Sequence, residues 1–143
     1  GLVINGGKAF KHYQSLILFL TGGQYFDENF KDVTQGFGTP RGKRVNVSIR
    51  KMRYAPSNRK TGTYTIDFVS GVDKEADLIA IAEMYGYIER KGAWYSIYDS
   101  ETGEEIEKVQ GMGNVRKKLQ EDTELFDKLY QATYEKCLEI EGY

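Results

Sequence analysis

The first half of the chain alternates between apolar and polar positions, the period of a β-strand. Residues 15–20 form a compact apolar run of strand length, typical of a strand buried on both faces. Residues 44–53 and 63–69 alternate more clearly, and the polar segment 57–62 between them has the composition of a turn. We therefore expect these two strands to form a hairpin. The segment 22–43 has neither period and predicts a loop.

After residue 71 the apolar positions recur at the 3.6-residue spacing of an α-helix. Those between residues 74 and 85 fall on one face of the predicted helix. Asp73 is placed to cap its start, and Gly86 stands where a glycine ends a helix. The change of period predicts a domain boundary at about residue 71.

The last third of the chain predicts two short strands followed by two helices. The strands are 93–98 and 105–109, with turn residues between them. Asn114 is expected to cap a helix that ends at residue 120, and Thr123 a last helix that ends near residue 140. The pattern therefore predicts an α/β chain of the α+β type in two parts, residues 1–71 and 72–143.

Charge is divided unevenly along the chain, although its net value is only −1. Residues 1–60 carry 11 Lys and Arg against 3 Asp and Glu, whereas residues 61–143 carry 9 against 18. This asymmetry indicates an anion-binding half beside an acidic one, or surfaces that attract each other between subunits, or a chance scatter. The longest apolar run is too short for a membrane span, and Cys137 is the only cysteine. We expect a cytoplasmic protein without a membrane partner.

Few side chains in this sequence suit catalysis. The sequence has one His, one Cys, no GxxxxGK[ST] phosphate-binding motif and no paired Cys/His spacing. We therefore predict no catalytic residue, no metal site and no cofactor held by this chain alone. His12, close to Phe10, is more typical of packing or of an interface than of a catalytic triad.

Two basic clusters are candidates for binding phosphate groups. The second consists of Arg90 and Lys91 and directly precedes the aromatic residues Trp94 and Tyr95. Both clusters suit the phosphates of a nucleotide or of a nucleic acid, but Lys and Arg also protect exposed strand edges. We expect Trp94 to lie in the core. The first cluster comprises Arg41, Lys43, Arg44, Arg50, Lys51 and Arg53.

The segment Lys91-Gly92-Ala93-Trp94-Tyr95-Ser96 resembles an Ala-Gly-Ala-Trp-Tyr-Ser stretch in the C-terminal domain of RecA recombinases. Residues 6–15 are similar to the segment that follows the second DNA-binding loop of that family. Between them, residues 44–56 resemble its basic strand ending in proline, and residues 64–71 the strand before its C-terminal domain. The resemblance implies that the first part holds the last strands of a RecA-like ATPase core. The second part would be the C-terminal domain.

The resemblance also implies roles for residues near the start of the chain. Gly6, Gly7 and Lys8 would lie at the edge of the loop that holds single-stranded DNA. Phe10 and His12 would lie near a subunit interface, although the family has phenylalanine where this chain has His12.

Further roles fall on the two basic clusters. Arg50, Lys51 and Arg53 would contact the phosphates of ATP bound to a neighbouring subunit, as an arginine finger does. Arg90, with Lys91 beside it, would contact duplex DNA. ATP and Mg would be bound by the parent protein.

The resemblance implies a piece of a DNA recombinase that forms homo-oligomeric filaments on single-stranded DNA. The parent would promote ATP-dependent homologous pairing and strand exchange, acting on single-stranded and double-stranded DNA. This chain would supply DNA-binding and inter-subunit surfaces. Two alternatives are a stand-alone, winged-helix-like module that binds duplex DNA without ATPase function, and a protein-interaction domain with an acidic helical face.

Overall fold

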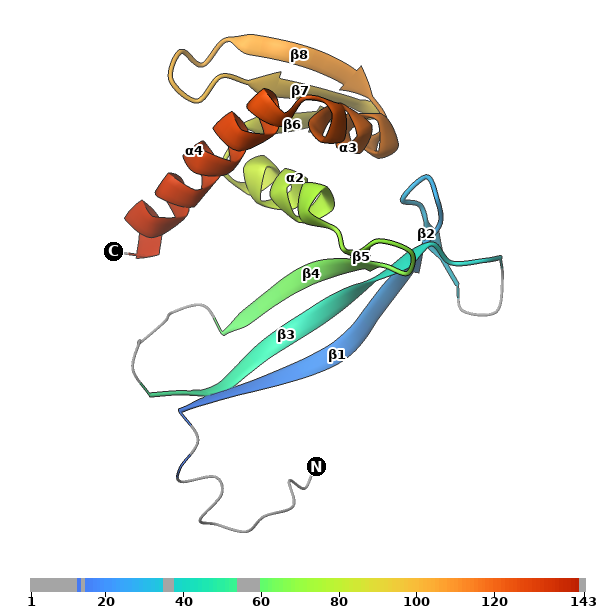
Figure 1. Ribbon diagram of the computed structural model, residues 1–143, viewed down its shortest axis with the longest axis vertical. Helices are drawn as coiled ribbons and strands as arrows, with labels where there is room; N and C mark the ends of the chain where they lie inside the picture. Colours follow the sequence, from blue (N-terminus) through green and yellow to red (C-terminus); the bar gives the residue numbers. More distant parts are fainter. Residues whose placement is uncertain (1–12, 14, 35–37, 54–59, 142–143) are drawn as a thin grey trace.

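The computed structural model describes residue 13 and residues 15–34, 38–53 and 60–141 (Figure 1). The described residues form two antiparallel sheets and three helices, which confirms the mixed α and β class. No helix in this part of the chain has the length and apolarity that crossing a membrane requires.

The first sheet has the strand order β2-β1-β3-β4-β5. The predicted hairpin is confirmed, because β3 and β4 pair antiparallel. The predicted loop over 22–43 is wrong at both ends, since strands run past Gly22 and begin again at Gly42. The register shift between Gly22 and Tyr25 lets β1 continue through its glycines. The strands are β1 (Leu16–Phe26), β2 (Asp32–Val33), β3 (Gly42–Met52), β4 (Thr61–Asp67) and β5 (Gly71–Val72).

Phe26 is the one fully buried aromatic side chain among the described residues of this sheet. It packs over Gly42, where an added Cβ would meet the Phe26 ring at 2.3 Å and the Ile66 carbonyl oxygen at 2.4 Å. Only glycine leaves room for this contact, because packed interiors tolerate no overlap.

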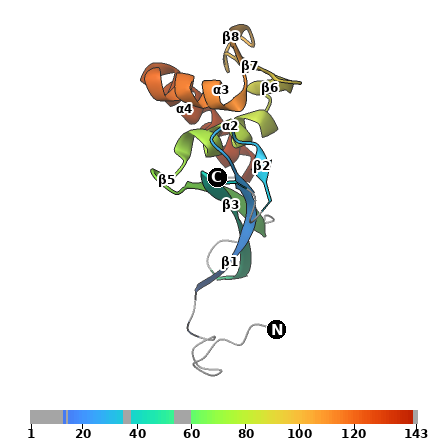
Figure 2. The same cartoon turned by 90° about the vertical axis from the view of Figure 1, so that its right-hand side faces the viewer.

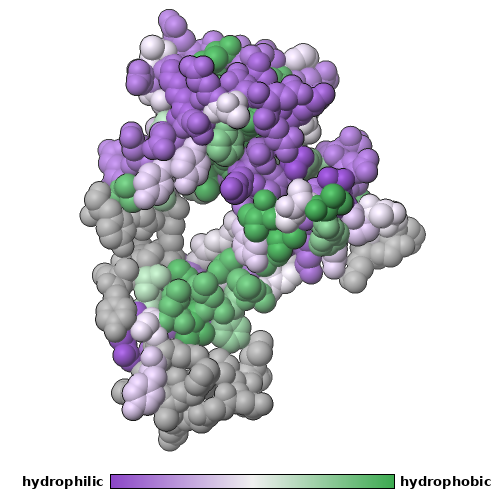
Figure 3. All heavy atoms as spheres, in the orientation of Figure 1, coloured by the Kyte–Doolittle hydropathy of each residue, from purple (hydrophilic) through white to green (hydrophobic). Residues whose placement is uncertain are grey.

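The prediction that residues 15–20 are buried on both faces is wrong in this chain. Leu16, Leu18 and Leu20 are all exposed, and Figure 3 shows apolar side chains gathered over β1 and β3. On the side of β1 away from β3, only Tyr25 and Phe26 are paired with another described strand. The run is strongly apolar, yet nothing in the described residues covers it.

The second part has a three-stranded sheet with the order β6-β7-β8, and Figure 2 shows the helices gathered beside it. Strand β6 is absent from the predictions, because its sequence Ile-Glu-Arg-Lys holds a single apolar residue. It forms through backbone pairing with β7, from Ile88 opposite Ile97 to Lys91 opposite Trp94. The elements are α2 (Lys74–Met84), β6 (Ile88–Lys91), β7 (Trp94–Tyr98), β8 (Glu105–Gln110), α3 (Met112–Glu121) and α4 (Thr123–Glu141).

One hydrophobic core joins these three helices to one face of the sheet. Each helix contributes, as do strands β6 and β7, and alternate positions of β7 point into this core. Its buried members are Leu78, Ile79, Ala82, Ile88, Tyr95, Ile97, Val115, Leu119 and Leu129.

The predicted start and end of α2 are confirmed. The Asp73 carboxylate accepts the Ala76 backbone N–H at 3.0 Å, and Gly86 has a φ of 79° just after the helix. The other carboxylate oxygen of Asp73 accepts Arg116 Nε at 2.6 Å. The Arg116 guanidinium lies 5.4 Å from the centre of the Phe30 ring, so this contact links the two parts.

The predicted caps of the last two helices are wrong. Asn114 lies inside the first turn of α3 and donates from its side chain to the Gln110 carbonyl at 2.8 Å. The cap of α4 is Asp122, whose carboxylate accepts the Leu125 N–H at 3.0 Å, and Thr123 is already helical. An aspartate side chain one residue earlier is at least as good a cap as a threonine hydroxyl.

Candidate nucleic-acid interface

Part of the predicted site lies outside the residues that the structure describes. This holds for Gly6, Gly7 and Lys8, expected at single-stranded DNA, and for Phe10 and His12, expected at a subunit interface. These assignments stay predictions.

Half of the first basic cluster contacts residues of the first sheet. Arg41 Nε lies 2.6 Å from Asp67 Oδ2, and Arg44 Nη1 lies 2.6 Å from Asp32 Oδ1. Lys43 Nζ lies 4.8 Å from the centre of an aromatic ring on β1. Each of these three cations thus already has a partner within the first part.

A β-bulge brings Arg50 and Lys51 to one face of the sheet. The pairing of β1 with β3 shifts between Ile17 and Leu18, so Arg50 is an extra residue without a partner on β1. Lys51 lies opposite Ile17, and the Arg50 guanidinium lies 5.3 Å from the centre of the Phe19 ring. Ile17 and Phe19 share a face because side chains alternate along a strand. Neighbouring cations, which a regular strand would separate, therefore lie side by side.

Arg53 follows directly after β3, and its backbone N–H donates to the Ser15 carbonyl at 2.9 Å. Its side chain is exposed, as is that of Arg50. All three expected ATP-contacting residues therefore lie at the end of β3 that points away from the helices (Figure 1).

Arg90 and Lys91 lie on opposite faces of β6. Arg90 is opposite the buried Tyr95, and its guanidinium lies 5.6 Å from the centre of that ring. Arg90 Nε also donates to the Gly92 carbonyl at 3.2 Å. Lys91 is opposite Trp94 on the outer face, and Trp94 is 44% exposed. The prediction that Trp94 lies in the core is therefore wrong, because Tyr95 takes the inward position.

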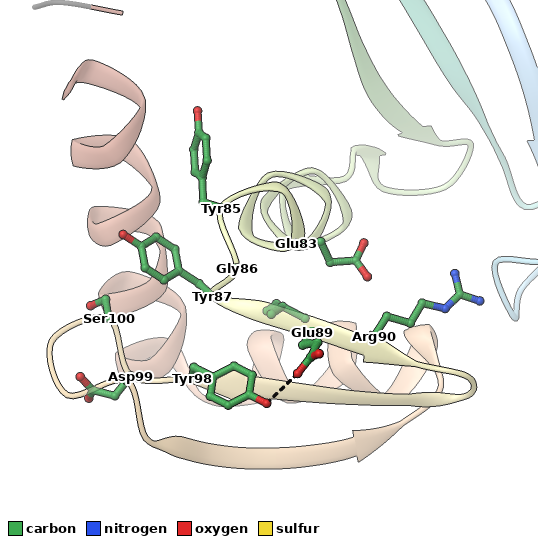
Figure 4. A pocket seen from close by; sticks show the side chains of 11 residues that line it. Glu83, Tyr85, Gly86, Tyr87, Glu89, Arg90, Tyr98, Asp99 and Ser100 are labelled. Atoms are coloured by element: carbon green, nitrogen blue, oxygen red, sulfur yellow. Dashed lines mark hydrogen bonds between the residues drawn. The ribbon is translucent and has the colours of Figure 1, made fainter. Parts of the chain in front are cut away.

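Arg90 and Lys91 each have an acidic side chain nearby. These two acidic residues, Glu83 and Glu89, line a hollow of about 610 Å³ (Figure 4). Hydrogen bonds from Lys91 and from the Tyr98 hydroxyl, at 2.9 Å, hold the pKa of Glu89 below its usual value. Burial raises the pKa of Glu83, an effect that the nearby Arg90 partly offsets. Each cation thus has one acidic neighbour, which limits the charge that it offers to a phosphate.

One arginine from each basic cluster lines the same cleft. Arg44 and Arg90 line one cleft of about 580 Å³ between the first sheet and the second part, together with the rings of Phe30 and Tyr95. Figure 4 shows Arg90 extending from the end of β6 toward the strands of the first sheet. Arg50 is not among the residues that line this cleft.

One further cation lies on the outer face of the second sheet, beside Trp94, although the sequence patterns do not single it out. Lys108 of β8 places its Nζ 5.8 Å from the centre of the Trp94 ring. The alternation around Val109, which packs against the core, already places Lys108 on the outer face. Its pairing with Trp94 depends on the sheet.

Comparison with known proteins identifies the second part of the chain. Residues 76–138 match the family model of the RecA C-terminal domain. The chain is 35% identical to protein RecA of Thermotoga neapolitana over 131 residues, which are 92% of this chain and 34% of the relative. It is 32% identical to protein RecA of Aquifex aeolicus over 130 residues, 91% of this chain and 33% of that protein.

Similarity extends to protein RecA of Streptococcus pneumoniae, with 31% identity over 137 residues, 96% of this chain and 32% of the relative. The chain spans about a third of the length of the curated relatives that it matches. Residues 76–138 therefore form a RecA C-terminal domain, and the chain as a whole is similar to a portion of RecA proteins.

Proposed function

We propose that this chain is part of a DNA recombinase that forms filaments on single-stranded DNA and promotes ATP-dependent homologous pairing and strand exchange. The chain supplies surfaces for DNA and for neighbouring subunits, whereas the parent protein binds ATP and Mg. The similarity to RecA proteins over more than nine-tenths of the chain supports this role.

Residues 1–71 are, in this proposal, the last strands of a RecA-like ATPase core, and residues 72–143 are the C-terminal domain. Two observations support the division. All members of the hydrophobic core cluster lie between residues 78 and 129. In contrast, the exposed leucines of β1 and its largely unpaired edge suit a sheet that continues into further strands.

The observation that carries the DNA-binding role is the position of Arg90. Its guanidinium stands at the end of β6, supported by the Tyr95 ring and the Gly92 carbonyl, and its side chain is exposed. Arginine held in this way loses less conformational entropy when it contacts a phosphate. Arg90 is therefore the residue of the second part that we assign to duplex DNA, with Lys91 as a weaker contact on the opposite face.

Substituting Arg90→Gln tests this assignment. We expect the affinity of the 143-residue chain for duplex DNA to fall about three- to tenfold, because one phosphate contact is lost. The slope of the logarithm of affinity against the logarithm of salt concentration should fall by about 1. Gel-shift titrations at several salt concentrations measure both quantities.

The matched control is Lys117→Gln, on an exposed cation of α3 that pairs with Glu121. This variant should bind duplex DNA as the unchanged chain does. An unaltered affinity and salt slope in the Arg90 variant would remove Arg90 from the DNA-binding surface.

For the subunit interface, the pair formed by Arg50 and Lys51 is the strongest candidate. The bulge places both cations on one face, where together they can contact the phosphates of ATP held by a neighbouring subunit. Arg53 follows two residues after Lys51, directly after the end of β3. In the intact protein, Arg50→Gln with Lys51→Gln should abolish DNA-stimulated ATP hydrolysis while DNA binding by the isolated chain is retained.

A further inference from the structure

The outer face of the β6-β7-β8 sheet carries an exposed tryptophan between cations. Lys91, Trp94 and Gln110 lie side by side across the three strands. In the next row, Lys108 lies opposite Ser96. The helices pack against the other face, where the core residues of β7 point, so this outer face has no cover in the described part of the chain.

Exposure of Trp94 is costly for the folded chain alone. It is the only tryptophan of the sequence, and 44% of its surface is open to solvent while the neighbouring Tyr95 is buried. A large aromatic side chain in this position forgoes much of the stabilisation that burial brings. The sheet therefore presents part of a flat, apolar ring outward, where burial against a partner would stabilise it further.

Two lysines frame this ring. Lys108 Nζ lies 5.8 Å from the ring centre, and no ion pair of Lys108 occurs within the described residues. Lys91 is 71% exposed on the other side and forms an ion pair with Glu89 at 3.1 Å. An aromatic platform with flanking cations is the arrangement that binds single-stranded nucleic acid, since a base stacks on the ring while phosphates meet the cations.

We propose that Trp94 stacks on an unpaired base of single-stranded DNA, while Lys108 and Lys91 contact the phosphates on either side of that base. The inference rests on the proposed function for the choice of DNA as the polymer. It adds a second contact, on the face opposite Arg90, and it names the form of DNA. A paired base is already stacked within a duplex, so the ring selects for single strands.

The negative charge of Glu89 weakens the binding of single-stranded DNA at this site. Its carboxylate lies beside Lys91 and would repel an approaching phosphate. Glu89→Gln removes that repulsion and releases Lys91, so it strengthens binding of single-stranded DNA about two- to threefold. A residue with a purely structural role would not improve binding when its ion pair is removed.

The fluorescence of Trp94 reports on the proposed contact directly, because no other tryptophan contributes. The 143-residue chain is titrated with an oligothymidylate, with an abasic oligonucleotide of equal length and charge, and with a duplex. Stacking predicts quenching by the oligothymidylate and little change with the other two. Equal quenching by the abasic strand would overturn the stacking contact.

Variants then measure the contribution of each side chain to the affinity for a labelled oligothymidylate. Trp94→Ala weakens binding about tenfold, and Trp94→Phe, which keeps an aromatic ring, restores part of it. Lys108→Gln weakens binding about threefold and lowers the salt slope by about 0.7. Lys117→Gln again serves as the control, because its ion pair lies on α3.

The outcomes separate this inference from the proposed function. If Arg90→Gln weakens duplex binding but Trp94→Ala leaves single-strand binding and fluorescence unchanged, the inference is wrong and the proposed function stands. If single strands quench the ring and Arg90→Gln has no effect on duplex binding, the stacking contact stands and Arg90 is removed from the duplex-binding surface. A chain that binds neither form of DNA contradicts both.

Discussion

The Asp67 carboxylate accepts hydrogen bonds from three other residues of the first part. One carboxylate oxygen accepts Arg41 Nε at 2.6 Å, and the other accepts the N–H groups of Val69 and Ser70 at 2.8 and 2.9 Å. Burial by itself would raise the pKa of Asp67, but the hydrogen bonds from Arg41, Ser70 and Val69 together lower it to about 2. The ionised form is therefore the one that the fold stabilises.

This lowered pKa predicts a stability that depends on pH. In the unfolded chain an aspartate titrates at a pKa of about 3.9, so the stabilisation is complete above about pH 4. It disappears as the pH falls toward 2, where the folded carboxylate is also protonated. Asp67→Asn should therefore lower the free energy of unfolding by up to about 2 kcal/mol at pH 7 and have almost no effect near pH 2.

Urea unfolding followed by circular dichroism at both pH values measures this difference. The control is Asp32→Asn, which removes the exposed ion pair with Arg44 and should cost less than about 1 kcal/mol. Equal losses for the Asp67 variant at pH 7 and pH 2 would contradict the assigned charge state.

The regularity of each strand decides where its cations point. In β3 the extra residue Arg50 joins Lys51 on one face, whereas regular alternation in β6 separates Arg90 from Lys91. Sequence adjacency is the same in both pairs. Only the pairing with a neighbouring strand distinguishes them, because a bulge depends on the register of both strands.

The bulge predicts an asymmetric response to deletions in β3. Deleting Arg50 removes the residue that has no partner on β1, so the pairing on either side is kept and stability changes by less than about 1 kcal/mol. Deleting Val47, which is opposite Leu20, shifts the register and moves every later side chain to the other face. Thermal unfolding of both deletion variants tests this, and similar losses in the two would contradict the bulge.

The whole molecule has two parts, and the hydrophobic core cluster of its described residues lies in the second. The link between them is narrow and polar: Asp73 holds Arg116 against Phe30, and the Asp77 carboxylate accepts the Thr65 N–H at 2.9 Å. Such contacts orient the second part but contribute little apolar burial. The second part therefore owes its stability to its own core.

Residues 72–143 expressed alone should therefore fold cooperatively. They keep the core cluster and the pair of Asp73 with Arg116. Residues 1–71 alone should stay largely unfolded, because Phe26 is the only buried apolar side chain among the residues of that part that the structure describes. Circular dichroism and urea titration of both pieces measure this. Removing the core side chain in Ile79→Ala provides the control and should cost about 2–5 kcal/mol in the isolated second part.

The same pieces decide between the recombinase portion and the stand-alone module. Salt-sensitive binding of duplex DNA by residues 72–143 alone keeps the module as an alternative. Its absence from a folded 72–143 piece removes that alternative.

Most elements could be predicted from local pattern, and the errors have identifiable causes. The strand over β3, the hairpin with β4 and the helix capped by Asp73 follow from period and cap chemistry. The glycines of β1 suggested a loop, but a β-bulge lets the strand continue through them. Strand β6 was missed because its sequence is too polar. A strand that is stabilised mainly by pairing with a neighbouring strand need not show a clear hydrophobic pattern in its own sequence.

The candidate site could be predicted as a set of residue types but not as a geometry. By itself the sequence determined the family resemblance, the alternation of strands and the position of the cations along the chain, because these depend on neighbouring residues. Only the tertiary structure decided that Arg50 and Lys51 share a face, that Arg90 and Lys91 do not, and that Trp94 faces outward. The physical reason is that alternation separates two faces, while contacts distant in sequence determine which face is buried.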